Sequence, residues 1–231
     1  QFHKNKEKQQ KMAKKPLAIL TVVSGDGWTE LFKKLGADVV SGGQSMNPSV
    51  QELSSGMDNG QYEKYIILPN NKNIILAAQQ LQKMMGEKVH IVPSTNPMEG
   101  LAAAMAFSED NTLEENLAAM KERMGDIATA MITTAVRDSI VGETVIHKDD
   151  FMGIMKNHEV IAEKDFTKCF LDVLSHLITE DTEIVTIYSG KDLSEEDCLK
   201  EIDKAEKKYP DVTFETYRGG QPLYPMFISA E

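Results

Sequence analysis

Ser94-Thr95-Asn96-Pro97 stands between a β-like run and a helix-like run, and Ser45-Met46-Asn47-Pro48 repeats that arrangement earlier in the chain. Asn is favoured at the N-cap of a helix and Pro in its first turn, so each segment predicts a strand, a loop and a capped helix. Between them, a third apolar run leads into Asn70-Asn71-Lys72-Asn73. Because ligands and partners bind beyond the carboxyl ends of the strands in open α/β sheets, the three segments predict one shared polar edge.

The first half of the chain alternates β-branched runs with segments of helical period, which is typical of parallel strands joined by crossover helices. Apolar residues at steps of four, three and four, from Ile74 through Ala78 and Leu81 to Met85, form a stripe that can pack on a sheet. We predict an α/β lobe over residues 16–110 with a parallel, doubly wound sheet. Its strands are expected at 17–23, 37–40, 64–68 and 88–92, and its helices at 28–35, 49–57, 73–85 and 97–107.

The second half follows a different order of elements. Thr112-Leu113-Glu114-Glu115 has the form of a capping box, which predicts a bridging helix within residues 111–126. A C-terminal α/β lobe over residues 127–231 is predicted to hold a mixed sheet with helices on one side. Its expected elements are a strand at 128–137, an extended stretch at 143–147, a helix at 164–177, a strand at 183–188, a helix at 194–209 and terminal strands. Residues 1–15, rich in lysine, have the composition of a linker or tail.

Charge and hydropathy limit the classes of partner. The 231-residue chain has 25 Lys and Arg against 36 Asp and Glu, which gives a net charge of −11. That sign opposes binding to nucleic acid or to anionic lipid, so a basic or neutral partner is expected. The longest apolar runs are shorter than the ~20 residues that cross a bilayer, and no secretory signal precedes them. These features predict no transmembrane segment and a cytoplasmic location.

No catalytic residue and no metal site can be assigned from spacing. The 5 histidines show no paired-ligand spacing and no Cys-x-x-Cys accompanies them, while Cys169 and Cys198 occupy core-facing positions of predicted helices and are expected to be reduced. Ser24-Gly25-Asp26-Gly27 opens a helix where an anion could bind, but it lacks the spacing of known phosphate-binding loops. We interpret it as a plain turn capped by Ser24 or Asp26.

Candidate binding residues lie in the loops that follow the predicted strands. Each of the Asn, Ser and Thr side chains could equally cap a helix or form a loop. Arg137 and Arg218 end predicted strands and could contact a carboxylate or phosphate, although ion pairs with acids such as Asp138 or Glu215 are an alternative use. The full candidate set is Gly42, Gly43, Gln44, Ser45, Asn47, Asn70, Asn71, Asn73, Ser94, Thr95, Asn96, Arg137 and Arg218.

Three longer motifs, covering residues 36–49, 67–75 and 219–225, resemble a known family. They are Gly-Ala-Asp-Val-Val-Ser-Gly-Gly-Gln-Ser-Met-Asn-Pro-Ser, Ile-Leu-Pro-Asn-Asn-Lys-Asn-Ile-Ile and Gly-Gly-Gln-Pro-Leu-Tyr-Pro. They are similar to the C-terminal region of the A subunit of bacterial fatty acid kinase, a DhaL-containing protein. The resemblance covers nearly everything after residue 15 and implies a two-lobed, DegV-like α/β fold. It also implies a complex that phosphorylates a fatty acid held by a separate DegV-like carrier subunit, with the acyl phosphate feeding phospholipid synthesis.

The resemblance implies that this chain is not an enzyme on its own. In the family, an Asp-Gly-Asp-Thr-Gly type motif of a separate DhaL domain holds ATP and Mg²⁺, and Gly25-Asp26-Gly27 is only a fragment of it. We therefore expect a non-catalytic domain without a cofactor of its own, which docks the carrier in a protein that forms a homodimer at full length. A fatty-acid or small-anion binding module is the alternative, in which Ser45 and Ser49, or Ser94 and Thr95, hold the anion with help from Arg137 or Arg218. A free-standing kinase is the least favoured, because phosphoryl transfer needs a phosphate cradle and metal ligands.

Overall fold

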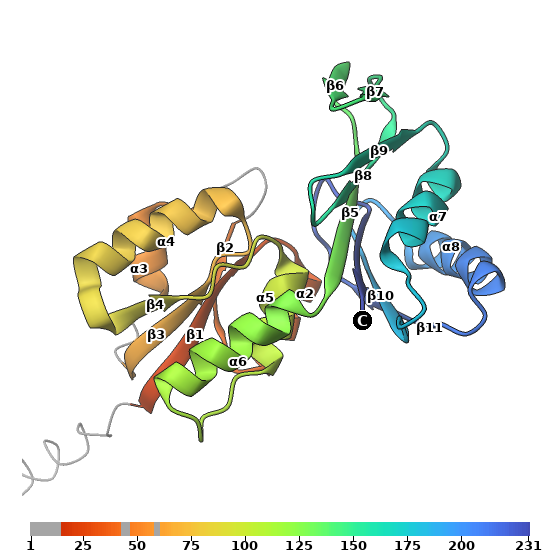
Figure 1. Ribbon diagram of the computed structural model, residues 1–231. Helices are drawn as coiled ribbons and strands as arrows, with labels where there is room; N and C mark the ends of the chain where they lie inside the picture. The colour runs from red at the N-terminus through yellow and green to blue at the C-terminus, as the bar shows by residue number, and fades with distance from the viewer. Residues whose placement is uncertain (1–14, 43–46, 58–60) are drawn as a thin grey trace, which may run out of the picture.

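The computed structural model describes residues 15–42, 47–57 and 61–231, which form two lobes, each built around its own β-sheet (Figure 1). The first lobe and the helix after it contain β1 (Lys15–Val23), α2 (Asp26–Lys34), β2 (Asp38–Ser41), α3 (Val50–Gly56), β3 (Tyr62–Leu68), α4 (Lys72–Met85), the 3₁₀ helix η1 (Gly86–Lys88), β4 (Val89–Ile91), α5 (Pro97–Met105) and α6 (Leu113–Gly125). The second contains β5 (Ala128–Thr134), β6 (Ser139–Val141), β7 (Thr144–Ile146), β8 (Phe151–Met155), β9 (Val160–Glu163), α7 (Phe166–Leu177), β10 (Ile184–Ser189), α8 (Glu195–Lys208), β11 (Thr213–Arg218) and β12 (Met226–Ala230).

The N-terminal lobe is organised around parallel strands in the order β2-β1-β3-β4. Helices α2 and α5 pack on one face of this sheet, where Ile66 and Leu68 enter the core. Helices α3 and α4 pack on the other face, and the α4 stripe of Ile74, Ala78 and Leu81 is buried there. The predicted parallel, doubly wound sheet is therefore confirmed, and the carboxyl ends of its strands lie at one edge.

The C-terminal lobe has the mixed sheet that the sequence predicts. Its strand order is β11-β10-β12-β5-β8-β9, with β10 and β11 parallel and the other neighbours antiparallel. Helices α7 and α8 bury one face, whereas Tyr188 and Phe227 on the other face join the core of the first lobe. Helix α6 leads from one lobe to the other, and its predicted capping box between Thr112 and Glu115 is present. Within the described residues, none of the helices combines the length and apolar character needed to cross a membrane.

One expectation for this lobe was wrong in detail. The strand predicted over 128–137 ends at Thr134, because the chain turns out of the sheet after Ala135 and continues into a separate hairpin of β6 and β7. The extended stretch expected at 143–147 is confirmed, since it contains β7, the second strand of that hairpin. Strands β8 and β9 were not predicted at all. Gly153 interrupts the β-branched pattern there, since a side chain at that position would press on Val173 and Ile161.

A buried joint connects the lobes. Trp28 at the start of α2 has no exposed surface, stacks on Tyr188 at 4.4 Å between ring centres, and donates from Nε1 to Gln221 Oε1 at 2.9 Å. The amide of Gln221 in turn donates to the carbonyl oxygens of Tyr188 and Tyr224. Because aromatic stacking and buried hydrogen bonds both depend on the position of the partner, this joint fixes how the lobes meet.

Glycines allow the two backbones of this joint to touch. A Cβ at Gly27 would overlap the carbonyl oxygen of Arg218, and one at Gly25 would lie 2.6 Å from that of Gly219. The Trp28 N–H donates to the Gly219 carbonyl at 3.1 Å, and neither Ser24 nor Asp26 caps α2, contrary to the expectation from sequence. A loop of the opposite lobe thus accepts the hydrogen bond from the start of α2, and it occupies the position where an anion could have bound.

Candidate functional site

A pocket of about 240 Å³ lies between the two lobes. Its N-terminal wall consists of residues 71–73 at the start of α4 and of Thr95 and Asn96 before α5. Its C-terminal wall consists of residues from β5, the end of β8 and His158 in the turn that follows. This interlobe pocket brings together two of the loops that the sequence predicted to share an edge, so we take it as the candidate site.

Two helices begin at the interlobe pocket, and each is capped by an asparagine of the polar segment that precedes it. Asn71 Oδ1 accepts from the N–H of Asn73 at 2.9 Å, and Asn96 Oδ1 accepts from the N–H of Glu99 at 2.9 Å. The positive ends of both helix dipoles therefore point toward one small space, which favours negative charge there by about 0.3–1 kcal/mol per helix.

A carboxylate of the chain itself supplies the negative charge that the start of α5 favours. The side chain of Glu99 is buried, and its Oε1 accepts from the Thr95 N–H at 3.1 Å, from the Thr95 hydroxyl and from the Asn96 amide. Its Oε2 lies 3.5 Å from Lys156 Nζ, which comes from the other lobe. Glu99 thus fills the place at the start of α5 where the carboxylate of a ligand would otherwise find these donors.

Basic groups from both lobes line the pocket. Lys156 is fully engaged, since its ammonium also donates to the carbonyl oxygens of Met124 and Ile127. Lys72 Nζ of the first lobe lies 2.8 Å from His158 Nε2 of the second, and both side chains are exposed. A neutral imidazole accepts from an ammonium at that distance. Lys72 and His158 are consequently the groups at this pocket that an anion from solution can reach.

Asn70 and Ser94 lie beneath the pocket and are used for folding. The Asn70 amide donates to Thr21 Oγ1 at 2.8 Å and to the Val22 carbonyl at 2.9 Å, while Ser94 Oγ donates to Asn70 Oδ1 at 2.8 Å. Asn70 also has a φ of 58°, and its side chain occupies the space that a Cβ on Gly100 would need. This buried network ties the ends of β1, β3 and β4 together.

The other candidate residues lie elsewhere. Gly42 is buried and donates to the Val23 carbonyl, and Asn47 is exposed. Gly43, Gln44 and Ser45 lie outside the described residues. Arg137 is exposed near the β6–β7 hairpin and Arg218 pairs with Asp26 across the lobe joint at 3.6 Å, so neither arginine lines the interlobe pocket and neither pairs with the acid suggested from sequence.

The candidate set omitted Glu99, Lys72, Lys156 and His158. Lys72 stood within a quoted motif, and Glu99 was visible as an acid in a helix first turn. Nothing in the sequence indicated that Lys156 and His158 belong to a site, because β8 and β9, the strands on either side of their turn, were not predicted. Their relation to the first lobe arises only through folding, since Lys72 and His158 are 86 residues apart.

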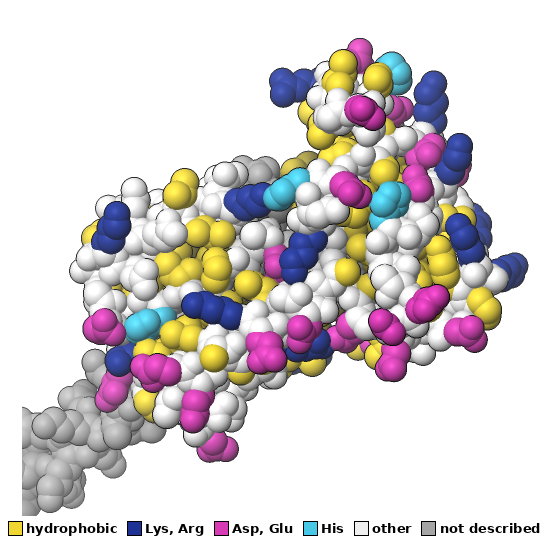
Figure 2. Space-filling view, viewed as in Figure 1, with side chains coloured by type: hydrophobic (Ala, Val, Ile, Leu, Met, Phe, Trp, Pro, Cys, Tyr) yellow, Lys and Arg dark blue, Asp and Glu magenta, His cyan; other side chains and the backbone are white. Residues whose placement is uncertain are grey.

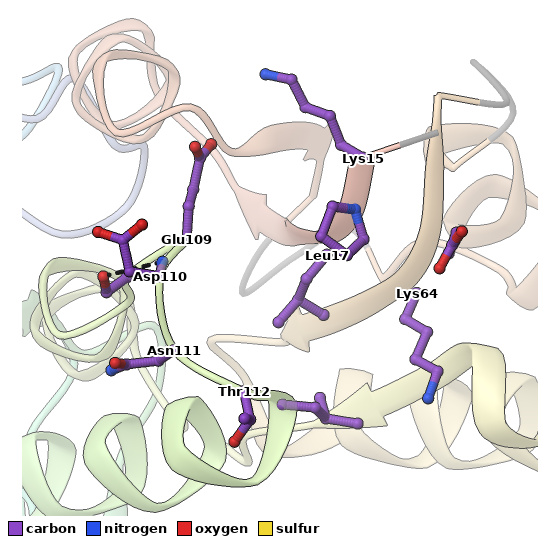
Figure 3. A pocket seen from close by; sticks show the side chains of 11 residues that line it. Lys15, Leu17, Lys64, Glu109, Asp110, Asn111 and Thr112 are labelled. Atoms are coloured by element: carbon purple, nitrogen blue, oxygen red, sulfur yellow. Dashed lines mark hydrogen bonds between the residues drawn. The ribbon is translucent and has the colours of Figure 1, made fainter. Parts of the chain in front are cut away.

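Neither cysteine offers a reactive thiolate. Both are free and buried, and burial raises the pKa of the Cys169 thiol to about 12 and also raises the pKa of Cys198. Among the described residues, no group of three or more His, Cys, Asp or Glu is placed to hold a metal ion. A second pocket, about 440 Å³, lies at the opposite end of the first sheet, where charges of both signs from Lys15, Glu109 and Asp110 surround Leu17 (Figure 3).

Glu99→Gln is expected to lower the free energy of unfolding by about 1–3 kcal/mol, because it leaves buried donors and the Lys156 ammonium without their anion. Urea unfolding followed by circular dichroism measures this. Glu122→Gln, on an exposed position of α6, is the matched control and should change stability by less than about 0.5 kcal/mol. Equal stabilities for the two variants would show that the Glu99 carboxylate is not needed at the pocket.

Comparison with solved structures places the fold among DegV proteins. The TM-score is 0.66 with a DegV family protein from Corynebacterium glutamicum, at 15% identity, covering 94% of this chain and 96% of that one. It is 0.60 with the Streptococcus pneumoniae fatty acid kinase B3 protein loaded with linoleic acid, at 8% identity, covering 94% and 99%. It is also 0.60 with dihydroxyacetone kinase from C. freundii, at 12% identity, covering 96% of this chain and 49% of that one. These identities are low, so the likenesses show the fold alone.

Sequence comparison gives the family. An uncharacterized protein of Staphylococcus aureus (strain USA300) is 35% identical over 222 residues, which cover 96% of this chain and 40% of the relative. One of Staphylococcus epidermidis is 36% identical over 215 residues, covering 93% and 39%. The chain thus spans about 40% of the length of the curated relatives it matches. The family of C-terminal regions of fatty acid kinase A-like subunits (FakA-like) matches residues 18–231, and this chain belongs to that family.

Proposed function

We propose that this chain is a non-catalytic part of the A-like component of an ATP-dependent fatty acid kinase, and that it docks the DegV-like carrier. The carrier presents its bound fatty acid to a kinase domain outside this chain, which forms the acyl phosphate for phospholipid synthesis in the cytoplasm. ATP and Mg²⁺ belong to that kinase domain. Membership of the family and the DegV-like fold support the proposal.

The burial of Glu99 is the observation that most supports carrier docking over lipid binding as the function of this chain. The chain has the two-lobed fold of proteins described as loaded with fatty acids, yet its own carboxylate occupies the donors at the start of α5. Side chains of the shared core, among them Trp28, Tyr188 and Phe227, fill the space between the lobes. The pocket that remains, about 240 Å³, is below the range of roughly 300–1,000 Å³ that holds drug-sized ligands.

Charge supports a protein partner. The chain carries a net charge of −11, and acidic side chains gather along the lower edge of the face shown in Figure 2. Such a surface attracts a basic partner over a distance of about a Debye length and makes the association rate depend on salt. The rim of the interlobe pocket, with Lys72 and His158, adds a small basic area where an acidic side chain of the partner can bind.

A titration of this chain into a purified DegV-like carrier loaded with fatty acid, followed by calorimetry, tests the proposal. We expect saturable binding below tens of micromolar. Lys72→Glu should weaken the binding at least tenfold, because it reverses the charge at the pocket rim. Lys83→Glu makes the same change near the other end of α4 and should alter the dissociation constant less than twofold. Absence of binding by the unmodified chain at tens of micromolar would remove the proposal.

Binding of a small anion is the second candidate, and the meeting of Lys72 with His158 favours it. Calorimetry with inorganic phosphate or acetate as the probe separates it from docking. If docking is the function, neither probe binds at millimolar concentration while the carrier binds. If the pocket is an anion site, the probes bind and Lys72→Glu abolishes the heat. Asn70→Ala is unsuitable for either test because it removes the buried network between the strands.

A further inference from the structure

His158 is held at the rim of the interlobe pocket by the backbone of its own turn. Its N–H donates to the Met155 carbonyl at 2.9 Å, and the Met155 N–H donates to the Glu159 carbonyl at 2.9 Å. The φ of His158 is 70°, in the left-handed region that glycine adopts most easily. A histidine at this position keeps a side chain where the turn itself favours glycine, which indicates that the imidazole has a use.

The imidazole of His158 contacts a charged group of the other lobe. Lys72 Nζ lies 2.8 Å from its Nε2 and 3.3 Å from its Nδ1. A neutral imidazole has one ring nitrogen without a proton, and that nitrogen accepts from the ammonium. An imidazolium carries a proton on both nitrogens, so protonation replaces this hydrogen bond with repulsion between two cations. Histidine is the side chain that ordinarily changes its charge between pH 5 and 8.

The charged groups around His158 do not compensate this repulsion. Of the described residues that line the interlobe pocket, Lys72, Lys156 and His158 are the titratable ones, and all three are bases. Lys156 is neutralised by Glu99, whose Oε2 lies 3.5 Å from its ammonium. Glu159 follows His158 in the sequence but lines a different pocket. Lowering the pH therefore creates two adjacent positive charges at the rim, within a chain whose net charge is −11.

We propose that His158 makes docking at the pocket rim depend on pH, because protonated His158 joins Lys72 in binding one carboxylate of the partner. With a neutral imidazole, the Lys72 ammonium donates to His158 rather than to a partner. With an imidazolium, a carboxylate between the two cations removes their repulsion, and each of its oxygens accepts from one of them. Since the partner binds the protonated form more tightly, docking takes up a proton from solution. This inference rests on the proposed docking of the carrier and adds its regulation.

Calorimetric titration of this chain into the loaded DegV-like carrier at two pH values tests the switch. We expect the dissociation constant to be about tenfold lower at about pH 6 than at about pH 8. His158→Gln keeps a hydrogen-bonding side chain that cannot gain a proton, so its two constants should differ by less than about twofold. His147→Gln, at an exposed histidine of the same lobe that lines another pocket, is the matched control and should keep the full difference. Equal constants for the unmodified chain, or a full difference in His158→Gln, would overturn the inference.

Proton uptake is a second measurement on the same complex. Titrations at about pH 7 in buffers with different enthalpies of ionisation give the number of protons that docking takes up. We expect fewer protons in His158→Gln than in the unmodified chain, and no change in His147→Gln. Equal uptake in His158→Gln and the unmodified chain would contradict the switch and leave docking itself standing. Absence of carrier binding at both pH values would instead remove the docking proposal, and the switch with it.

Discussion

Trp28→Ala is expected to lower the free energy of unfolding by about 3–5 kcal/mol, the largest loss for any single substitution considered for this chain. The indole is fully buried, stacks on Tyr188 and donates to Gln221. Its removal leaves a cavity in the core shared by both lobes and leaves the Gln221 carbonyl oxygen without its donor. Urea unfolding followed by far-ultraviolet circular dichroism measures the change.

Trp28→Phe serves as the companion variant because it keeps an aromatic ring but removes the hydrogen bond. We expect a loss of about 1–3 kcal/mol, the cost of an unsatisfied buried acceptor, plus partial loss of packing. A loss below about 1.5 kcal/mol in Trp28→Ala would mean that the lobes do not depend on this joint for stability.

Gly27→Ala is expected to destabilise the chain by about 3 kcal/mol, because a backbone carbonyl has to move to admit one methyl group. The new Cβ would overlap the carbonyl oxygen of Arg218, and the turn after β1 is also held by the bond from Trp28 N–H to the Gly219 carbonyl. Since Trp28 is the single tryptophan of the chain, its fluorescence reports the joint directly. We expect a red-shifted emission maximum and a lower urea midpoint.

Gly125→Ala is the control for this substitution. Gly125 ends α6, and apart from its chain neighbours and the backbone of its own helix nothing lies within 4 Å of the place that a methyl group would take there. Alanine should therefore leave the emission maximum and midpoint unchanged. If Gly27→Ala behaved like Gly125→Ala, the close approach of the two loops would not be a feature of the folded protein.

Local signals in the sequence predicted local structure well. Asn71, Asn96 and Thr112 each cap the helix that their motif indicated, because N-capping depends on only a few consecutive residues. The cap expected at Asn47 was wrong: Ser49 caps α3, and its hydroxyl accepts from the N–H of Glu52. The parallel strands of the first lobe were found from β-branched runs between helical segments. Strands β8 and β9 were missed because Gly153 interrupts the run of β-branched residues that marks a strand. A glycine is needed there because α7 and β9 pack close to it, and sequence spacing does not show those contacts.

The candidate site was predicted only in outline. The loops after β3 and β4 do meet at one edge, but the sequence could not tell which polar side chains face the pocket and which support the fold. Asn70 turns inward to Thr21, 49 residues away, and Trp28 reaches Gln221 across 193 residues. The first pairing follows from how the strands of the first lobe are ordered, and the second follows from how the two lobes pack. Sequence spacing contains neither, so it could not show the use of Asn70 or the closure of the Gly25–Gly27 turn.

Native mass spectrometry of this chain mixed with a DegV-like carrier and excess fatty acid tests the central claim most directly, because each mass identifies which protein holds the lipid. The account predicts that the chain alone appears without fatty acid and that a complex of chain, carrier and one fatty acid forms. Fatty acid retained by the chain itself, together with no mass for the complex, would contradict it.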